Sequence, residues 1–308
     1  MAGAGLFPAN LVGQNRLPFD IGWMATALAA AVLAYKPVRE RVSRVLPVDP
    51  DNPVHSFALV LAVLLLGTQL TSSAFISLSA STPLSLADVI AEQLSLLVLA
   101  LAGVGLFIRR DFAQAASRLG LVAPAWWHVV LALAAAGVFF VFSEAMIGLS
   151  HALTPDVAKQ VDSNTQRLFA ALDNPWGIAA LALAPGICEE LLFRGAIQPR
   201  LGIIATALLF ASVHTQYALS LDTLAVFVIA IGLGLIRKFT NTSTSSMCHI
   251  SYNLLTGIGI ASSQLAGAIG IEALLIAVSV YAIWANRHRM AAAGEALTTR
   301  VGIQENNE

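Results

Sequence analysis

The sequence predicts an all-α, polytopic membrane helical bundle of about nine transmembrane helices, and two observations lead to this fold class. Of the 308 residues, 57% are hydrophobic and only 11% are charged, and the mean hydropathy is +0.76. Soluble domains carry about 25% charged residues, and a chain this apolar could not cover its surface, so lipid must be the solvent for much of it. The apolar runs are also continuous instead of alternating, which argues against a β-barrel.

The apolar runs are long enough to serve as spans, since a helix needs ~20 mostly apolar residues to cross ~30 Å of hydrocarbon. Residues 1–20 lack a basic segment followed by an apolar core, so we expect the first run to stay as a span. That first run is short, and the fifth carries charges that must face protein or water. In order, the expected spans are 21–36, 54–78, 86–108, 125–149, 175–197, 201–220, 222–238, 243–261 and 265–286.

Lysine and arginine residues predict the orientation in the membrane. With nine spans, every basic cluster falls on the same side, and of the 17 basic residues only Arg16, Lys159 and Arg167 lie on the other. Cytoplasmic loops carry the excess of basic residues. We therefore expect an integral protein of the plasma (inner) membrane, with its N-terminus outside and its C-terminus in the cytoplasm.

A polar connection divides the chain into two groups of spans. Residues 151–174 form the longest polar stretch on the external side. They separate the N-terminal transmembrane helices, within 1–150, from a second group at 175–286. The sequence indicates no role for the first group. Residues 287–308 form a short, polar cytoplasmic tail.

Charged residues deep in a span mark candidate functional sites, because each is costly unless it faces protein or water. Glu190 and Arg194 in the fifth span are four residues apart, the spacing of a helical ion pair. Glu189 points about 100° away from Glu190 and has no partner in its own helix. An unpaired carboxylate at membrane depth can serve as a general base. Asp88 and Glu92, near the start of the third span, are instead interpreted as a solvated pair at the membrane surface.

Two histidines and an asparagine lie in later apolar segments. His214 is about 20 Å along the sixth span, and His249 and Asn253 share one face of the eighth because they are four residues apart. Together with Glu189, these residues come from three helices. Membrane helices turn their polar groups toward a shared interior, so the sequence predicts that all four face one cavity.

These residues form three ordered motifs: Glu189-Glu190-x-x-x-Arg194, Phe210-x-x-x-His214 and His249-x-x-x-Asn253. Together, each within an apolar span, they resemble the motifs of the CPBP family of intramembrane endopeptidases. That family groups the CAAX-processing endopeptidases with bacteriocin self-immunity proteins. The resemblance covers about 175–268, and the first four spans carry no matching motif.

The resemblance implies a protease domain at 175–286, built as a helical bundle around a conical cavity, that hydrolyses peptide bonds within the membrane. A water activated by Glu189 with His214 would attack the scissile carbonyl, and His249 with Asn253 would stabilise the oxyanion. The catalytic residues implied are Glu189, Glu190, His214, His249 and Asn253, and Glu190 also forms a structural ion pair with Arg194. The expected partners are a peptide or membrane-protein substrate and the lipid bilayer, and the net charge of −1 gives no indication of nucleic acid.

Metal dependence leaves two alternatives open. Glu189, His214 and His249 could ligate zinc and leave one position for water. Yet the chain has no His-Glu-x-x-His motif, and Glu189 cannot easily be both a ligand and the sole base. We therefore favour a mechanism without a cofactor, with zinc as the alternative. Cys188 and Cys248 adjoin motif residues and are interpreted as small buried thiols.

Two other functions compete with the protease. A catalytically idle relative, such as a binding or immunity protein, could use the same cavity, but it would not need to keep Glu189 or His214. A transporter could relay protons through the same groups, but transporters of this kind show broken helices in two related halves. Here the motif residues lie only in the second half, so the transporter ranks last.

Overall fold

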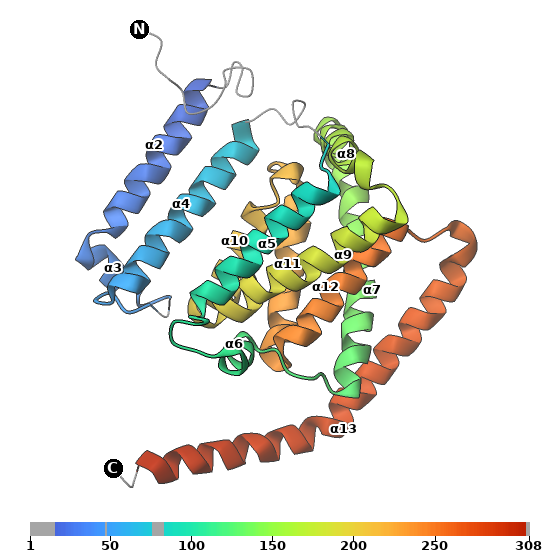
Figure 1. Cartoon of the computed structure of the whole chain (residues 1–308). Coiled ribbons are helices and arrows are strands. Elements are labelled where there is room, and N and C mark those ends of the chain that lie inside the picture. Colours follow the sequence, from blue (N-terminus) through green and yellow to red (C-terminus); the bar gives the residue numbers. More distant parts are fainter. Residues whose placement is uncertain (1–15, 47, 76–82, 306–308) are drawn as a thin grey trace.

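The computed structural model describes residues 16–46, 48–75 and 83–305, and within these ranges it confirms the all-helical prediction, with no β-strand (Figure 1). The N-terminal half holds α2 (Arg16–Leu33), α3 (Lys36–Val42), α4 (Pro53–Phe75), α5 (Leu86–Gly103), α6 (Phe112–Leu119) and α7 (Trp126–Leu153). The rest holds α8 (Pro155–Phe169), α9 (Pro175–Glu189), η4 (Glu190–Ile197), α10 (Gln198–Ser212), α11 (Leu221–Phe239), α12 (Thr242–Ile258) and α13 (Leu265–Glu305). Short 3-10 turns, among them η5 (Thr215–Tyr217), connect some of these helices.

Six helical stretches in the described ranges are long and apolar enough to cross a membrane, so the predicted count of nine is not confirmed. The predicted spans 222–238 and 243–261 are helical but are not among the six. α11 carries one charge in its first turn and two in its last, and α12 has 17 residues and begins with a run of hydroxyl side chains. The six are Arg16–Leu33, His55–Ser72, Leu86–Gly103, Trp126–Leu153, Pro175–Ser212 and Ser262–Asn286.

α12 lies at the centre of the C-terminal helices, where it packs against α7, α9 and α11 (Figure 1). α5 packs against α9 and η4, and α10 packs against α11. α13 lies along α7 at one edge of the molecule, while α2 and α4 pair at the opposite edge. The first turns of α12 bury Thr242, Thr244 and Ser245, and such small side chains let membrane helices approach closely.

The helix that carries the first motif changes its winding at the motif itself. α9 ends at Glu189 and continues directly as a π-helix over Glu190–Ile197. Short π-helical segments are rare and are often found at functional sites. The chain then turns a corner at Gly202, whose φ of 77° lies in the left-handed region that favours glycine. This corner divides the Pro175–Ser212 stretch close to the boundary expected between the fifth and sixth spans.

The π-helix is held against the end of α6. Arg118 Nη1 donates to the Gly195 carbonyl oxygen at 3.3 Å, and Thr242 Oγ1 donates to the Leu119 carbonyl oxygen at 2.6 Å. Partial burial, with Arg200 nearby, lowers the pKa of Arg118 from its ordinary value. Gly195 lies so close to α6 that a Cβ added there would be 2.9 Å from the Leu119 carbonyl oxygen.

This close approach predicts that Gly195→Ala destabilises the packing of η4 against α6. The added methyl group would meet backbone, which moves less readily than a side-chain tip, so we expect a loss of about 1–3 kcal/mol in unfolding free energy. Gly148→Ala in α7 is the matched control, because a Cβ at Gly148 meets nothing within 4 Å. Thermal unfolding in detergent measures both. Equal melting temperatures for the two variants would contradict the proposed contact.

Candidate active site

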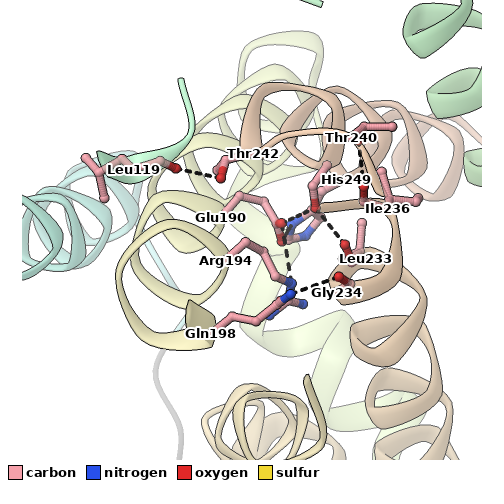
Figure 2. Close-up of polar contacts among 11 residues, drawn as sticks. Leu119, Glu190, Arg194, Gln198, Leu233, Gly234, Ile236, Thr240, Thr242 and His249 are labelled. Carbon is pink, nitrogen blue, oxygen red and sulfur yellow. Dashed lines mark hydrogen bonds and ion pairs between the residues drawn. The ribbon is translucent and has the colours of Figure 1, made fainter. Parts of the chain in front are cut away.

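Glu190 is the buried anchor of the motif residues (Figure 2). Its carboxylate is 0% exposed, and Oε2 lies 3.5 Å from Nε of Arg194, which is also 0% exposed. Oε1 lies 3.2 Å from His249 Nδ1, and Ser245 Oγ donates to Oε2. A buried carboxylate needs a cation and hydrogen-bond donors, and Glu190 takes them from both η4 and α12. The structure therefore ties the first motif to the third.

The contact with Glu190 determines how His249 can act. A carboxylate only accepts hydrogen bonds, so His249 must carry a proton on Nδ1. If the ring is neutral, Nε2 is then an acceptor. If the ring is doubly protonated, Nε2 becomes a donor, and the Glu190 carboxylate balances the positive charge of the ring. The oxyanion role predicted for His249 requires this second, cationic form.

Phe210 joins the charged groups to both histidines. The centre of the Arg194 guanidinium lies 4.7 Å from the Phe210 ring centroid, within the range of a cation–π contact. The rings of His214 and His249 lie 4.7 and 5.9 Å from the same ring, centroid to centroid. The second motif thus contributes a packing surface as well as a histidine, which the sequence did not indicate.

His214 lies just beyond the C-terminal end of α10, and a carbonyl of that helix holds its ring. Its Nδ1 lies 2.8 Å from the Phe210 carbonyl oxygen, which can only accept, so the ring proton sits on Nδ1. When the ring is neutral, Nε2 keeps a free lone pair. The ring of Tyr217 lies parallel to that of His214 at a centroid distance of 6.4 Å. This arrangement suits a proton acceptor.

Glu189 has surroundings unlike those of Glu190. It is 8% exposed, and its Oε1 accepts a hydrogen bond from Gln93 Nε2 at 3.2 Å. Its Oε2 is buried and has no hydrogen-bond donor among the residues that the structure describes. Glu189 also interacts electrostatically with Arg194 and with Glu92. Of two adjacent carboxylates, one is therefore fully partnered and the other keeps an oxygen available.

Sequence reasoning missed the contribution of α5. Asp88 is exposed and closes a capping box with Ser85, which fits its interpretation as a surface residue. Glu92 is exposed as well, which also fits that interpretation, and it interacts electrostatically with both Glu189 and His214. The available signal was a polar Glu92-Gln93 pair inside an apolar span, but nothing in the sequence showed which helix it would meet.

Asn253 compensates for a proline. A proline inside a helix has no N–H, so the carbonyl four residues earlier loses its hydrogen bond. Pro185 lies inside α9 and frees the carbonyl of Leu181 in this way. Asn253 Nδ2 donates to that oxygen at 3.2 Å and so ties α12 to α9. The second hydrogen of the Asn253 amide is not needed for this bond.

The residues predicted as alternative metal ligands are not gathered in this structure. Within the described part of the chain, no three His, Cys, Asp or Glu side chains lie close enough to hold a metal ion. Nδ1 of His249 is engaged by Glu190, and Glu189 accepts from Gln93. The zinc alternative stays an untested prediction. Cys188 and Cys248 are both buried and free.

Residues 171–255 match the Rce1-like family, type II CAAX prenyl endopeptidase. This match confirms the resemblance to the CPBP family, and its range includes every predicted site residue. No curated protein and no solved structure matches the chain. The apolar helices and the family match together indicate an integral membrane protein.

The buried ion pair generates a first prediction about this site. Arg194→Gln leaves Glu190 as a buried carboxylate without its cation, so we expect unfolding free energy to fall by about 3–5 kcal/mol. Arg16→Gln is the matched control, because Arg16 and Asp20 have the same i,i+4 spacing but both side chains are more than half exposed. Expression level and thermal unfolding are the measurements. A melting temperature for Arg194→Gln equal to that of the control would refute the anchoring role of the pair.

The proline contact generates a second prediction, best tested as a double-mutant cycle. Asn253→Ala strands the Leu181 carbonyl, which costs about 1–3 kcal/mol of unfolding free energy. Pro185→Ala restores a backbone N–H for that carbonyl, so Asn253→Ala should cost less in this background. Thermal unfolding of the four proteins gives the coupling. Strictly additive effects would show that Asn253 does not compensate for Pro185.

Proposed function

We propose that this chain is an intramembrane endopeptidase that uses Glu189 and His214 to activate a water molecule. The observation that carries the proposal is the difference between two adjacent buried carboxylates. Glu190 is fixed by Arg194, His249 and Ser245, whereas Glu189 keeps Oε2 without a donor. Adjacent acids held in different environments are a common basis for divided roles in catalysis.

The proposed reaction is a direct hydrolysis. The water oxygen forms a bond to the scissile carbon while one water proton moves to Glu189, with His214 Nε2 sharing the proton load. The carbonyl oxygen becomes an oxyanion, stabilised by the cationic form of His249 and the second N–H of Asn253. The acid then returns the proton to the amide nitrogen as the carbon–nitrogen bond breaks. The products are a carboxylate and an amine.

The roles of Glu190 and Arg194 in this proposal are positional. Arg194 keeps Glu190 ionised, and Glu190 in turn supports the charge on His249. Peptide or membrane-protein segments would be the substrates, in keeping with the peptide chemistry of the matched family. No cofactor is required by this scheme, and zinc held by Glu189, His214 and His249 is the alternative that the experiment below separates.

The test compares purified wild type with Glu189→Gln and His214→Ala on a panel of membrane peptides, with and without a prenyl group. Each substitution removes part of the water activation, so we expect turnover to fall by about 10²–10⁴-fold while thermal unfolding stays close to wild type. Glu144→Gln in α7 is the matched control and should keep full activity, because Glu144 is exposed and lies outside the motifs.

A strong chelator completes this experiment. Activity that survives the chelator supports the cofactor-free scheme, and activity lost with the chelator and restored by zinc favours the metal alternative. Wild-type turnover by Glu189→Gln would overturn the proposed base. No cleavage of any peptide by wild type would favour the idle relative that binds in the same cavity.

A further inference from the structure

A residue from the N-terminal half completes the candidate site. α5 lies outside the matched range 171–255, yet it packs against both α9 and η4. Its Gln93 is only 6% exposed and donates from Nε2 to Glu189 Oε1 at 3.2 Å. This is a direct hydrogen bond between the first group of spans and the proposed base.

Two oxygen acceptors next to this hydrogen bond have no donor within the described part of the chain. They are Oε1 of Gln93 and Oε2 of Glu189, and both are buried. Gln93 Oε1 belongs to the same amide as the donating Nε2, and Glu189 Oε2 belongs to the same carboxylate as the accepting Oε1. Buried acceptors are costly when unsatisfied. A water molecule has two O–H donors and suits a pair of acceptors of this kind.

We propose that Gln93 is a catalytic residue that holds the attacking water together with Glu189. The Gln93 N–H orients the Glu189 carboxylate, and its Oε1 accepts one hydrogen of the water. The other hydrogen points at Glu189 Oε2 and leaves as the proton when the water oxygen bonds to the scissile carbon. That proton then passes to the leaving amine. This assignment rests on the proposed function and gives the N-terminal spans a part in it.

A purely structural role for Gln93 makes different predictions, and the chain provides a control for it. Gln198 is also 6% exposed, donates to the backbone oxygen of Gly234 at 2.9 Å, and has an Oε1 without a donor. Its hydrogen bond connects α10 to the backbone of α11 and does not involve Glu189. Removing either amide costs packing, but only Gln93 should affect the chemistry.

Several ionisable groups surround Glu189 and will shape any pH dependence. Glu92 on α5, Arg194 on η4 and Tyr217 on η5 each interact electrostatically with it. Cys188 precedes it on α9 and also interacts with it, and His214 lies near Glu92. All of these groups remain in the variants below, so a change in pH profile reports on residue 93.

The experiment measures turnover, KM and pH profile for Gln93→Leu, Gln93→Glu and Gln198→Leu, next to wild type and Glu189→Gln. We expect Gln93→Leu to lower kcat by roughly 10²-fold with little change in KM, because the water and the base lose their orientation. Gln93→Glu can reproduce the amide contacts only when the introduced carboxyl is protonated. Its activity should therefore exceed that of Gln93→Leu at low pH and fall as the pH rises. Gln198→Leu should lower thermal stability without moving the pH profile.

The outcomes separate this assignment from the proposed function. If wild type cleaves and Glu189→Gln does not, the proposed function stands, and wild-type kcat and pH profile in Gln93→Leu would overturn the Gln93 assignment alone. If Gln93→Leu fails to fold, Gln93→Glu decides, and a wild-type pH profile in that variant overturns the assignment. If Glu189→Gln cleaves like wild type, the proposed base fails and the Gln93 assignment fails with it.

Discussion

The burial of the Glu190 carboxylate is the constraint on which the C-terminal bundle depends. A charge removed from water is tolerated only when cations and donors replace its hydration. Arg194 meets this need from η4, and His249 and Ser245 meet it from α12. Because these partners come from different helices, satisfying one carboxylate fixes the position and rotation of both helices. Phe210 adds a third helix, since its ring contacts Arg194 and both site histidines.

This arrangement leaves Oε2 of the neighbouring Glu189 without a donor among the described residues, and the surrounding helices position the other groups of the proposed site. A π-helical turn begins directly after Glu189, and α5 brings Gln93 against it. Pro185 breaks the hydrogen-bond pattern of α9, and the freed carbonyl holds Asn253 by one of its two amide hydrogens. Each site group is thus held by a contact that still leaves an atom available for chemistry. Such preorganisation lowers the cost of orienting groups during reaction.

The sequence predicted the helical fold and the motif positions because these depend on composition and on spacing within one helix. It could not predict contacts between helices that are distant in the chain. The Gln93–Glu189 hydrogen bond joins residues 96 apart, and hydropathy does not say which spans are neighbours. The contact between η4 and α6, through Arg118 and Gly195, likewise joins segments that are distant in the chain. The sequence did indicate that a hydrogen-bond donor such as Asn253 was needed, because Pro185 inside a helix frees a carbonyl that some donor must satisfy. Nine spans were not confirmed, because α11 carries charges in its first and last turns and α12 has only 17 residues and begins with hydroxyl side chains.

Direct attack by a water held at Glu189 is the central claim, and oxygen labelling tests it most directly. A single turnover of a cleaved membrane peptide would be run in water enriched in oxygen-18, followed by mass spectrometry of the product and of the enzyme fragment containing Glu189. The account predicts one heavy oxygen in the new carboxyl terminus of the product and none in the Glu189 fragment. An unlabelled product, or label in the Glu189 carboxyl, would show that the glutamate attacks the substrate itself and would contradict the account.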